Sequence, residues 1–228
     1  MPEPGGVGLS AVGTGHLRGA EAPVAGVQAR IREVQPLVEL RATFTVTRAA
    51  VDDVERGSTD SDWQPVKDAA EALATAEDLL VFAGSAAANV EGLIPSSSNA
   101  PIPLADDPRD LPDALAKALT ELRTVGVQGP YSLLLSSELY TAATESSDHG
   151  YPILAHLSRI LDDGEIVFAP ALQGALVVST RGGDYTLTIG QDVSIGYLSH
   201  DAAGVTLYLQ ESVSFRASTA EASVVLTR

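Results

Sequence analysis

The sequence predicts an α+β protein, with helices in the middle of the chain and strands toward both ends. Apolar and polar residues alternate over residues 27–46, which predicts strands because successive side chains of a strand point to opposite faces. Two later segments, residues 61–84 and 111–125, repeat apolar residues at helical spacing. From residue 166 onward, short apolar runs separated by turn residues predict further strands.

The first 46 residues are expected to form an arm followed by a two-stranded ribbon. Residues 1–19 are rich in glycine and show no steady period, which predicts a loop or an extended arm. Residues 27–32 and 38–46 alternate, and Gln35-Pro36 is the expected break between the two strands. An isolated ribbon is marginal in water, so we expect this one to lie on another body such as a neighbouring subunit.

The clearest helix begins after Ser61. Ser61 or Asp62 can cap it, and Pro65 falls in the first turn, where a missing N–H costs little. The helix is expected to end near Gly84. One side of it is apolar apart from a single glutamate, and consists of Val66, Ala69, Ala70, Leu73, Glu77 and Leu80.

The middle and the end of the chain alternate between regular elements and loops. Residues 91–110, which contain four prolines, and the polar residues 141–151 are predicted as loops. Helices are predicted over residues 111–125 and 153–161, with a short buried strand at residues 131–135. Later strands are predicted at residues 175–180, 185–189, 205–215 and 222–226, with Arg181-Gly182-Gly183-Asp184 as a hairpin turn between the first two.

Composition narrows the class of protein. The net charge of −16, from 30 acidic and 14 basic residues, disfavours binding to nucleic acid or to anionic lipid. The chain has no cysteine, which excludes disulfides and thiolate metal sites. No apolar run approaches the roughly 20 residues of a membrane helix, and the first ten residues lack a secretory signal, so a cytoplasmic protein is expected.

No pattern of residues assigns a catalytic, cofactor-binding or metal-binding role. None of the four histidines forms a pair at metal-ligand spacing. Ser147, Asp148 and His149 are consecutive, so their side chains point apart and do not form a triad among themselves. A carboxylate cluster could in principle serve a glycosidase or a hard cation, although a solvated surface is favoured; it consists of Asp52, Asp53, Glu55, Asp60 and Asp62.

Short motifs along nearly the whole chain resemble the encapsulin shell proteins, once described as linocin-type bacteriocins, and especially their actinobacterial members. Each motif is short, but their order and spacing make the match specific. They are Pro36-Leu37-Val38-Glu39-Leu40-Arg41, Asp52-Asp53-Val54-Glu55-Arg56-Gly57, Ser61-Asp62-Trp63, Pro65-Val66-Lys67, Gly129-Pro130-Tyr131, Ser147-Asp148-His149-Gly150-Tyr151-Pro152, Thr180-Arg181-Gly182-Gly183-Asp184, Asp192, Ser199-His200-Asp201, Leu207-Tyr208-Leu209-Gln210-Glu211 and Thr219-Ala220-Glu221-Ala222.

This resemblance implies a fold like that of the major capsid protein of tailed phages, with a peripheral domain, an axial domain and an extended loop. Residues 1–19 would then form an N-terminal arm, and residues 20–46 the extended loop as a β-ribbon. Residues 47–110 would form the peripheral domain with its long spine helix, residues 111–170 the axial domain, and residues 171–228 the return to the peripheral domain.

The resemblance also implies a function. The chain is expected to be a non-enzymatic shell subunit that assembles into an icosahedral cage, with T=1 as the expected size. Such a cage encloses cargo, typically a dye-decolorizing peroxidase or a ferritin-like protein held through a short C-terminal tail. In this family the tip of the axial domain surrounds the five-fold pore, so the pore candidates are Asp148, His149, Gly150 and Tyr151. An ordinary polar loop is the alternative for these four residues.

One departure from the family bears on cargo and assembly. Encapsulins normally begin with an amphipathic helix, a few tens of residues before the segment matching residues 5–13, and this sequence starts without it. We therefore assign no cargo-binding residues, and altered assembly is one expectation. Two other functions stay open from sequence. One is a phage-type capsid protein around nucleic acid, which the negative charge disfavours, and the other is a hydrolase using the acidic cluster.

Overall fold

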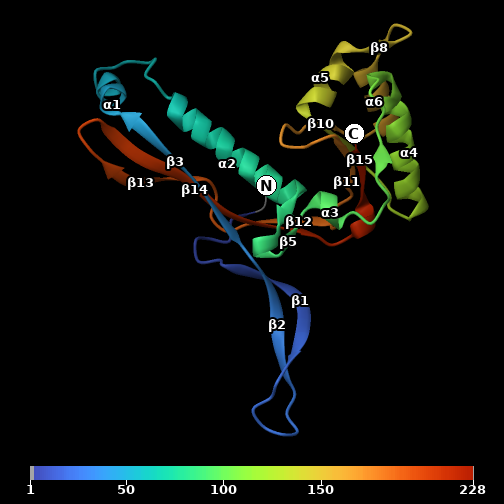
Figure 1. Ribbon diagram of the computed structural model, residues 1–228, viewed down its shortest axis with the longest axis horizontal. Coiled ribbons are helices and arrows are strands. Elements are labelled where there is room, and N and C mark those ends of the chain that lie inside the picture. The colour runs from blue at the N-terminus through green and yellow to red at the C-terminus, as the bar shows by residue number, and fades with distance from the viewer. Residues whose placement is uncertain (1–2, 228) are drawn as a thin grey trace. The chain divides into compact units, whose positions relative to one another are not determined.

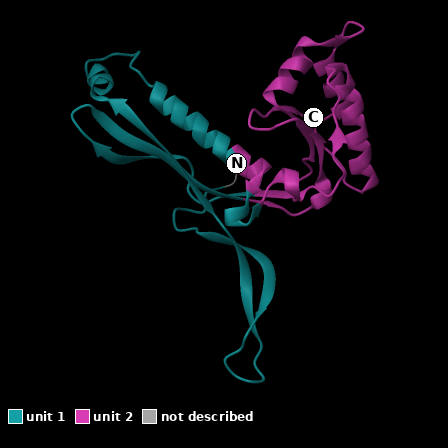
Figure 2. Cartoon of the chain, in the orientation of Figure 1, with its two compact units in different colours: residues 1–77, 85–90, 187–214 teal, residues 78–84, 91–186, 215–228 magenta. Residues whose placement is uncertain are grey.

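The computed structural model describes residues 3–227, which form two compact units (Figure 2). Unit 1 contains residues 3–77, 85–90 and 187–214. Unit 2 contains residues 78–84, 91–186 and 215–227. Each unit combines helices with a sheet, so the predicted α+β class is confirmed.

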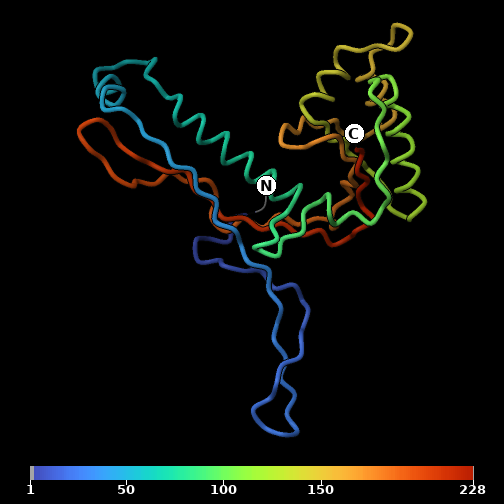
Figure 3. Tube along the Cα trace, viewed as in Figure 1, coloured from blue at the N-terminus to red at the C-terminus, as the bar shows by residue number. Residues whose placement is uncertain are grey.

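A two-stranded antiparallel ribbon in unit 1 is formed by β1 (Ala11–Ala20) and β2 (Ala29–Pro36). The trace in Figure 3 follows this hairpin out from the rest of unit 1 and back. Its register shifts between Gly13 and Leu17, where three residues of β1 face a single residue of β2. Such a bulge increases the local twist of a ribbon.

This pairing corrects two predictions. Residues 11–19 form a strand and not a loop. The sequence did not reveal this strand because glycines at positions 13, 15 and 19 interrupt the alternation of apolar and polar residues. The partner of β2 is β1, whereas β3 (Val38–Thr47) belongs to another sheet. Gln35-Pro36 does mark the break between β2 and β3, as expected.

The main sheet of unit 1 is built around β14 (Gly204–Ala217). One edge of β14 pairs antiparallel with β3, and the other with β13 (Ser194–His200). β12 (Tyr185–Ile189) also pairs with β14 and completes four strands. The predicted strand at residues 205–215 is therefore confirmed as the centre of this sheet.

Two helices of unit 1 follow β3. α1 (Arg48–Glu55) is capped by Thr47, whose hydroxyl accepts a hydrogen bond from the Ala50 backbone N–H. α2 (Gln64–Phe82) confirms the helix predicted after Ser61, and the Asp62 carboxylate accepts a bond from its first N–H. α2 packs on the sheet through a cluster of Phe44, Val46, Ala50 and Ala69, with Ala42, Val51, Val66, Leu207 and Leu209 at its margin.

Unit 2 is organised on a five-stranded sheet in the order β10-β7-β11-β15-β6. These strands are β10 (Ile166–Phe168), β7 (Tyr131–Leu135), β11 (Ala175–Ser179), β15 (Ser223–Thr227) and β6 (Ile102–Pro103). β7 and β11 are antiparallel, whereas β10 runs parallel to β7. The central strands are almost fully buried, which explains their continuous apolar sequences.

Three helices cover this sheet: α4 (Leu111–Thr124), α5 (Ser137–Glu145) and α6 (Ile153–Leu161) (Figure 1). Leu115, Leu122 and Leu157 are completely buried among them. α4 and α6 were both predicted. α5 was predicted as loop from residue 141 on, because its short polar sequence buries only Leu139 and Ala143.

Short elements complete the chain and correct two further predictions. The predicted loop at residues 91–110 contains the one-turn helix α3 (Leu93–Ser96), β6 and a 3₁₀ turn at residues 108–110. β4 (Gly84–Ser85) pairs with β5 (Val90–Glu91), and a 3₁₀ turn lies at residues 86–88 and another at residues 220–222. β11 and β12 do not pair as a hairpin, because β11 pairs with β7 and β15.

Candidate assembly surfaces and tip hairpin

The four predicted pore residues lie together in one hairpin of unit 2. β8 (Ser147–Asp148) pairs with β9 (Tyr151–Pro152), which places Asp148 opposite Tyr151. His149 and Gly150 form the two-residue turn, with φ values of 46° and 83°. Two consecutive positive φ angles define the tightest hairpin turns, and glycine adopts them at least cost.

The tip hairpin presents polar side chains to solvent. The His149 imidazole is 96% exposed, and its Nε2 lies 3.7 Å from an Asp148 carboxylate oxygen. The Tyr151 ring is exposed and lies edge-on to His156 at 6.1 Å between ring centres. Hydrogen bonding to Asp107 raises the pKa of Arg109, and the Asp148 carboxylate adds to that effect. The tip thus carries one nearly fully exposed imidazole beside one half-buried carboxylate.

The acidic cluster predicted as a solvated surface is divided among separate local interactions. Asp52 pairs with Arg48 at 3.1 Å, and Asp53 pairs with Arg56. Asp60 accepts a hydrogen bond from Ser58, and the remaining members are Glu55 and the helix-capping Asp62. Within residues 3–227, no group of three or more His, Asp or Glu side chains is arranged to hold a metal ion.

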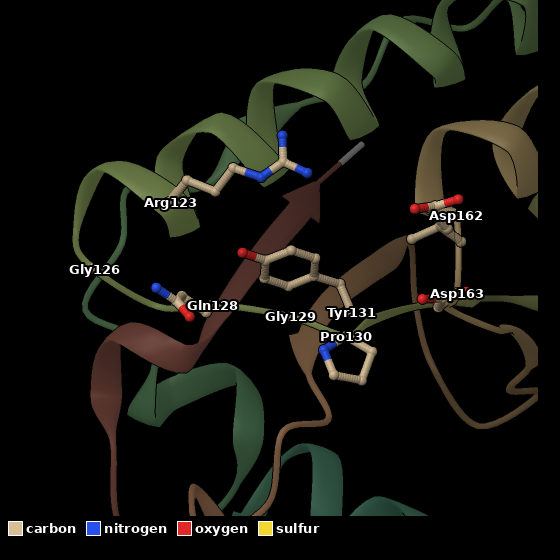
Figure 4. Close-up of a pocket in the computed structure, with 9 residues that line it drawn as sticks. Arg123, Gly126, Gln128, Gly129, Pro130, Tyr131, Asp162 and Asp163 are labelled. Carbon is tan, nitrogen blue, oxygen red and sulfur yellow. The ribbon is translucent and has the colours of Figure 1, made fainter.

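A pocket of about 670 Å³ in unit 2 opens where α4 and α6 end (Figure 4). The Arg123 guanidinium lies 5.8 Å from the centre of the Tyr131 ring, and the Tyr131 hydroxyl donates a hydrogen bond to the Val127 carbonyl. Asp162 and Asp163 stand on the other side of that ring. The described lining contains no serine, cysteine or histidine.

Apolar side chains on the ribbon of unit 1 lack cover from the described chain. Leu17 on β1 and Val34 on β2 are 53% and 57% exposed. The same holds for Ile31 on β2 and for Val24 and Val27 in the connecting loop. A row of exposed apolar side chains on a narrow ribbon marks a surface for another protein body.

A second exposed apolar surface lies along β13, an edge strand of the unit 1 sheet. Ile195 and Tyr197 are 61% and 57% exposed, and Val193 and Leu198 flank them. Edge strands with uncovered apolar side chains readily pair or pack with other chains. Together with the ribbon, this strand gives unit 1 two surfaces suited to repeated self-association.

Sequence reasoning missed two buried carboxylates. Asp184 is 3% exposed and accepts two hydrogen bonds of 2.9 Å from Arg181, which lower its pKa. Glu211 is also 3% exposed and lies on the inner face of β14. Burial, followed by the charges of Glu77 and Asp192, raises the pKa of Glu211 to about 7. The sequence feature that could have pointed to Glu211 is Glu77, because it is the one charged residue on the apolar side of α2.

Solved structures of shell proteins share this fold. A virus-like particle protein from Pyrococcus furiosus aligns with a TM-score of 0.67 at 19% identity, over 95% of this chain and 86% of the other. The capsid protein of Myoviridae phage XM1 aligns with a TM-score of 0.61 at 13% identity, over 98% of this chain and 87% of the phage protein. The chain therefore has the fold of capsid-type shells, and the predicted tailed-phage capsid fold is confirmed.

Sequence comparison narrows that class. A type 1 encapsulin shell protein from Brevibacterium linens is 59% identical over 224 residues, 98% of this chain and 84% of the relative. A type 1 encapsulin shell protein from Mycobacterium tuberculosis is 54% identical over 227 residues, which are 100% of this chain and 85% of the relative. The family described as "Encapsulating protein for peroxidase" matches residues 1–214.

This chain belongs to the encapsulin shell protein family. It is a structural subunit of a protein shell and not an enzyme, which confirms the predicted class and leaves the hydrolase alternative without support. The relatives are shell proteins of encapsulins, so the phage-capsid alternative is also disfavoured. None of the described helices is long and apolar enough to cross a membrane.

Proposed function

We propose that this shell subunit forms a T=1 icosahedral cage in the cytoplasm, around a cargo enzyme held through a short C-terminal tail. The family description names a peroxidase as the enclosed protein. A dye-decolorizing peroxidase is therefore the first cargo to test, and a ferritin-like protein the second. The net charge of −16 supports protein cargo over nucleic acid, because an acidic chain repels phosphate.

The observation that carries this proposal is the uncovered ribbon of β1 and β2. A two-stranded ribbon is not stable alone in water, and this one exposes Leu17, Ile31 and Val34. Burying such side chains gains about 25 cal/mol for each Å² of apolar surface removed from water. In a closed shell every ribbon meets the same surface of a neighbour, so the gain repeats at each interface.

The experiment is to introduce charge on one face of the ribbon and measure particle mass. Leu17 pairs with Arg32, so Leu17 and Val34 share a face of the ribbon. The double substitution Leu17→Asp and Val34→Asp is expected to convert shells to free subunits or small oligomers by mass photometry. Gln28→Glu, which adds negative charge near the ribbon tip, is the control and should leave shells intact. Intact shells from the double variant would contradict the role given to the ribbon.

The tip hairpin is proposed as the lining of the five-fold pore. His149 is exposed there, Asp148 is half-buried beside it, and Gly150 and Tyr151 complete the hairpin. A ring of carboxylates around a narrow opening attracts small cations and repels anions. The assigned function of these residues is thus selective passage of ions to the enclosed enzyme.

Ion entry tests this assignment directly. A fluorophore is enclosed in the shell, and the rate of its quenching by Co²⁺ is measured in wild type and in Asp148→Asn. Slower quenching is expected in the variant because the pore loses one negative charge per subunit. Asp162→Asn, outside the tip hairpin, is the control. Equal rates in wild type and Asp148→Asn would place the ion path elsewhere.

The domain boundaries implied by the resemblance enter the proposal with two changes. The resemblance implied an extended loop at residues 20–46 after an arm at residues 1–19. We assign the extended loop instead to the ribbon of β1 and β2, residues 11–36, because β3 belongs to the main sheet of unit 1. The resemblance implied a peripheral domain at residues 47–110 and 171–228 and an axial domain at residues 111–170. Because β11 and β15 lie in one sheet with β7 and β10, we assign these two strands to the axial domain as well. The position of the tip hairpin among the helices of unit 2 supports the axial assignment.

A further inference from the structure

On β3 and β14, the face of the unit 1 sheet that packs against α2 is apolar with one exception, Glu211. Residues of β14 that share this face alternate along the strand, and those of β3 stand opposite them in register. Glu211 is paired with Leu40 and follows Leu209 on the same face. On these two strands the face consists of Val205, Leu207, Leu209, Glu211 and Val213 of β14, with Val38, Leu40, Ala42, Phe44 and Val46 of β3. On β13, Ile195, Tyr197 and His200 pair with Leu209, Leu207 and Val205 and share the same face.

The helix that covers this face also carries one acid on its inner side. α2 contacts the sheet through Val66 and Ala69 in the cluster around Phe44. Three helical turns beyond Val66, the same side of α2 presents Glu77. The helix and the sheet therefore each bring a single glutamate into an otherwise apolar interface.

Glu211 is held in a setting that disfavours its charged form. The residue is 3% exposed, and its buried Oε1 has no hydrogen-bond partner among the described residues. A buried carboxylate without such partners is costly, whereas the neutral acid is tolerated. The two charges that act on Glu211 are both negative, Glu77 from α2 and Asp192 from the turn before β13.

The remaining neighbours do not neutralise Glu211. From β3 the facing residue is Leu40, because Glu39 and Arg41 belong to the opposite face of the sheet. There Arg41 donates hydrogen bonds to Gln210 and lies over the Tyr208 ring. On β14 itself the inner-face neighbours of Glu211 are apolar.

We propose that Glu211 and Glu77 form a proton-dependent latch that holds α2 on the sheet most firmly in acidic solution and loosens it as the pH rises toward neutral. While Glu211 is protonated, it behaves as a neutral polar group in an apolar interface. When it ionises, its charge faces Glu77 across the interface, and α2 and the sheet repel each other. Both residues belong to one subunit, so each copy in a shell would respond by itself and over the same pH range.

The direction in which pH changes the stability of α2 follows from the pKa of Glu211 in the folded and in the unfolded chain. The pKa of Glu211 is about 7 in the folded chain, against 4.5 for an unperturbed glutamate. The folded state therefore binds more protons between these values, and stability falls as pH rises from about 4.5 to about 7. Above that range the penalty is complete, and the equilibrium constant for opening α2 is larger by up to about 300-fold.

Hydrogen exchange of the assembled particles tests this latch. After correction for intrinsic exchange, opening of α2 is expected to rise steeply between pH 5 and pH 8 in wild type. Glu211→Gln keeps the shape of the side chain but cannot ionise, so its opening should stay constant over this range. Glu71→Gln, an exposed site on α2, is the matched control and should retain the wild-type response.

Two results would overturn the latch: a wild-type α2 whose opening does not change with pH, and a response that survives in Glu211→Gln. A second measurement on wild type alone covers the case in which Glu211→Gln does not fold. Infrared spectroscopy should detect a carboxylic acid C=O band that disappears near pH 7. If every carboxyl group of the folded particle has ionised below pH 6, the latch does not exist.

Discussion

Gly164 occupies a position that no other residue can fill without moving the backbone. A Cβ atom at this position would stand 1.8 Å from the carbonyl oxygen of Tyr131, where Cβ atoms essentially never come closer than 3.0 Å. The obstacle is the backbone of β7 and not a flexible side chain, so Gly164→Ala must displace the start of β7 or of β10. Overpacking of this kind costs about 1–3 kcal/mol, and more where the neighbour is rigid.

The loss of folding free energy caused by Gly164→Ala is expected near the top of that range. Replacing glycine by alanine gains about 0.4–1 kcal/mol through the unfolded state, which offsets little of a backbone clash. A net loss of about 2 kcal/mol lowers the midpoint of thermal unfolding by roughly 4–8 °C in a chain of this size. Gly8→Ala is the control, because no atom lies within 4 Å of its added methyl group. Its unfolding temperature should stay within about 1 °C of wild type.

Hydrogen exchange localises the damage. The Leu133 amide donates to the Glu165 carbonyl, and the Ala169 amide donates to the Leu135 carbonyl, both at 2.9 Å. These two amides join β7 to the segment around β10 and should exchange faster in Gly164→Ala, while amides of α2 stay unchanged. Wild-type exchange at both amides and an unchanged unfolding temperature would refute the clash.

Three further substitutions test the packing, charge and capping described above. Leu122→Ala removes a fully buried side chain from unit 2 and should cost about 3–4 kcal/mol in chemical unfolding. Asp184→Asn breaks the buried pair with Arg181 and should destabilise the chain at pH 7. Because that pair lowers the pKa of Asp184, the difference from wild type should shrink as pH falls below about 4. Thr47→Ala removes the cap of α1 and should cost about 1 kcal/mol.

The helices were predictable where their apolar side is continuous. α4 and α6 bury regularly spaced leucines, and the sequence located both within about one residue. α2 was found from its cap and Pro65 in addition to its apolar side. α5 was missed because it buries only two small or medium side chains, too few to set a period.

Strand pairing was less predictable, since it depends on contacts between distant parts of the chain. β1 contains glycines at positions 13, 15 and 19, which interrupt its alternation of apolar and polar residues. The sequence therefore predicted β3 as the pairing partner of β2, whereas β2 pairs with β1. The turn at Arg181–Asp184 was recognised, but the strands beside it join different sheets. A local turn signal fixes a reversal of the chain and not the partner that follows.

The candidate site was predictable only in part. The tip residues were named from a family resemblance, and the structure groups them in one exposed hairpin. The alternation around Glu211 places it on the inner face of β14, yet an acidic residue is usually expected outside. Its partnership with Glu77 joins two elements far apart in sequence, which no local pattern records.

The central claim is that this chain closes into a shell, and the mass of the purified particle tests it most directly. A T=1 shell of 60 copies of this 23.6 kDa chain has a mass of roughly 1.4 MDa. Charge-detection mass spectrometry together with electron microscopy should show one species near that mass, made of uniform hollow particles. A monomer or a small discrete oligomer as the largest species would contradict the account.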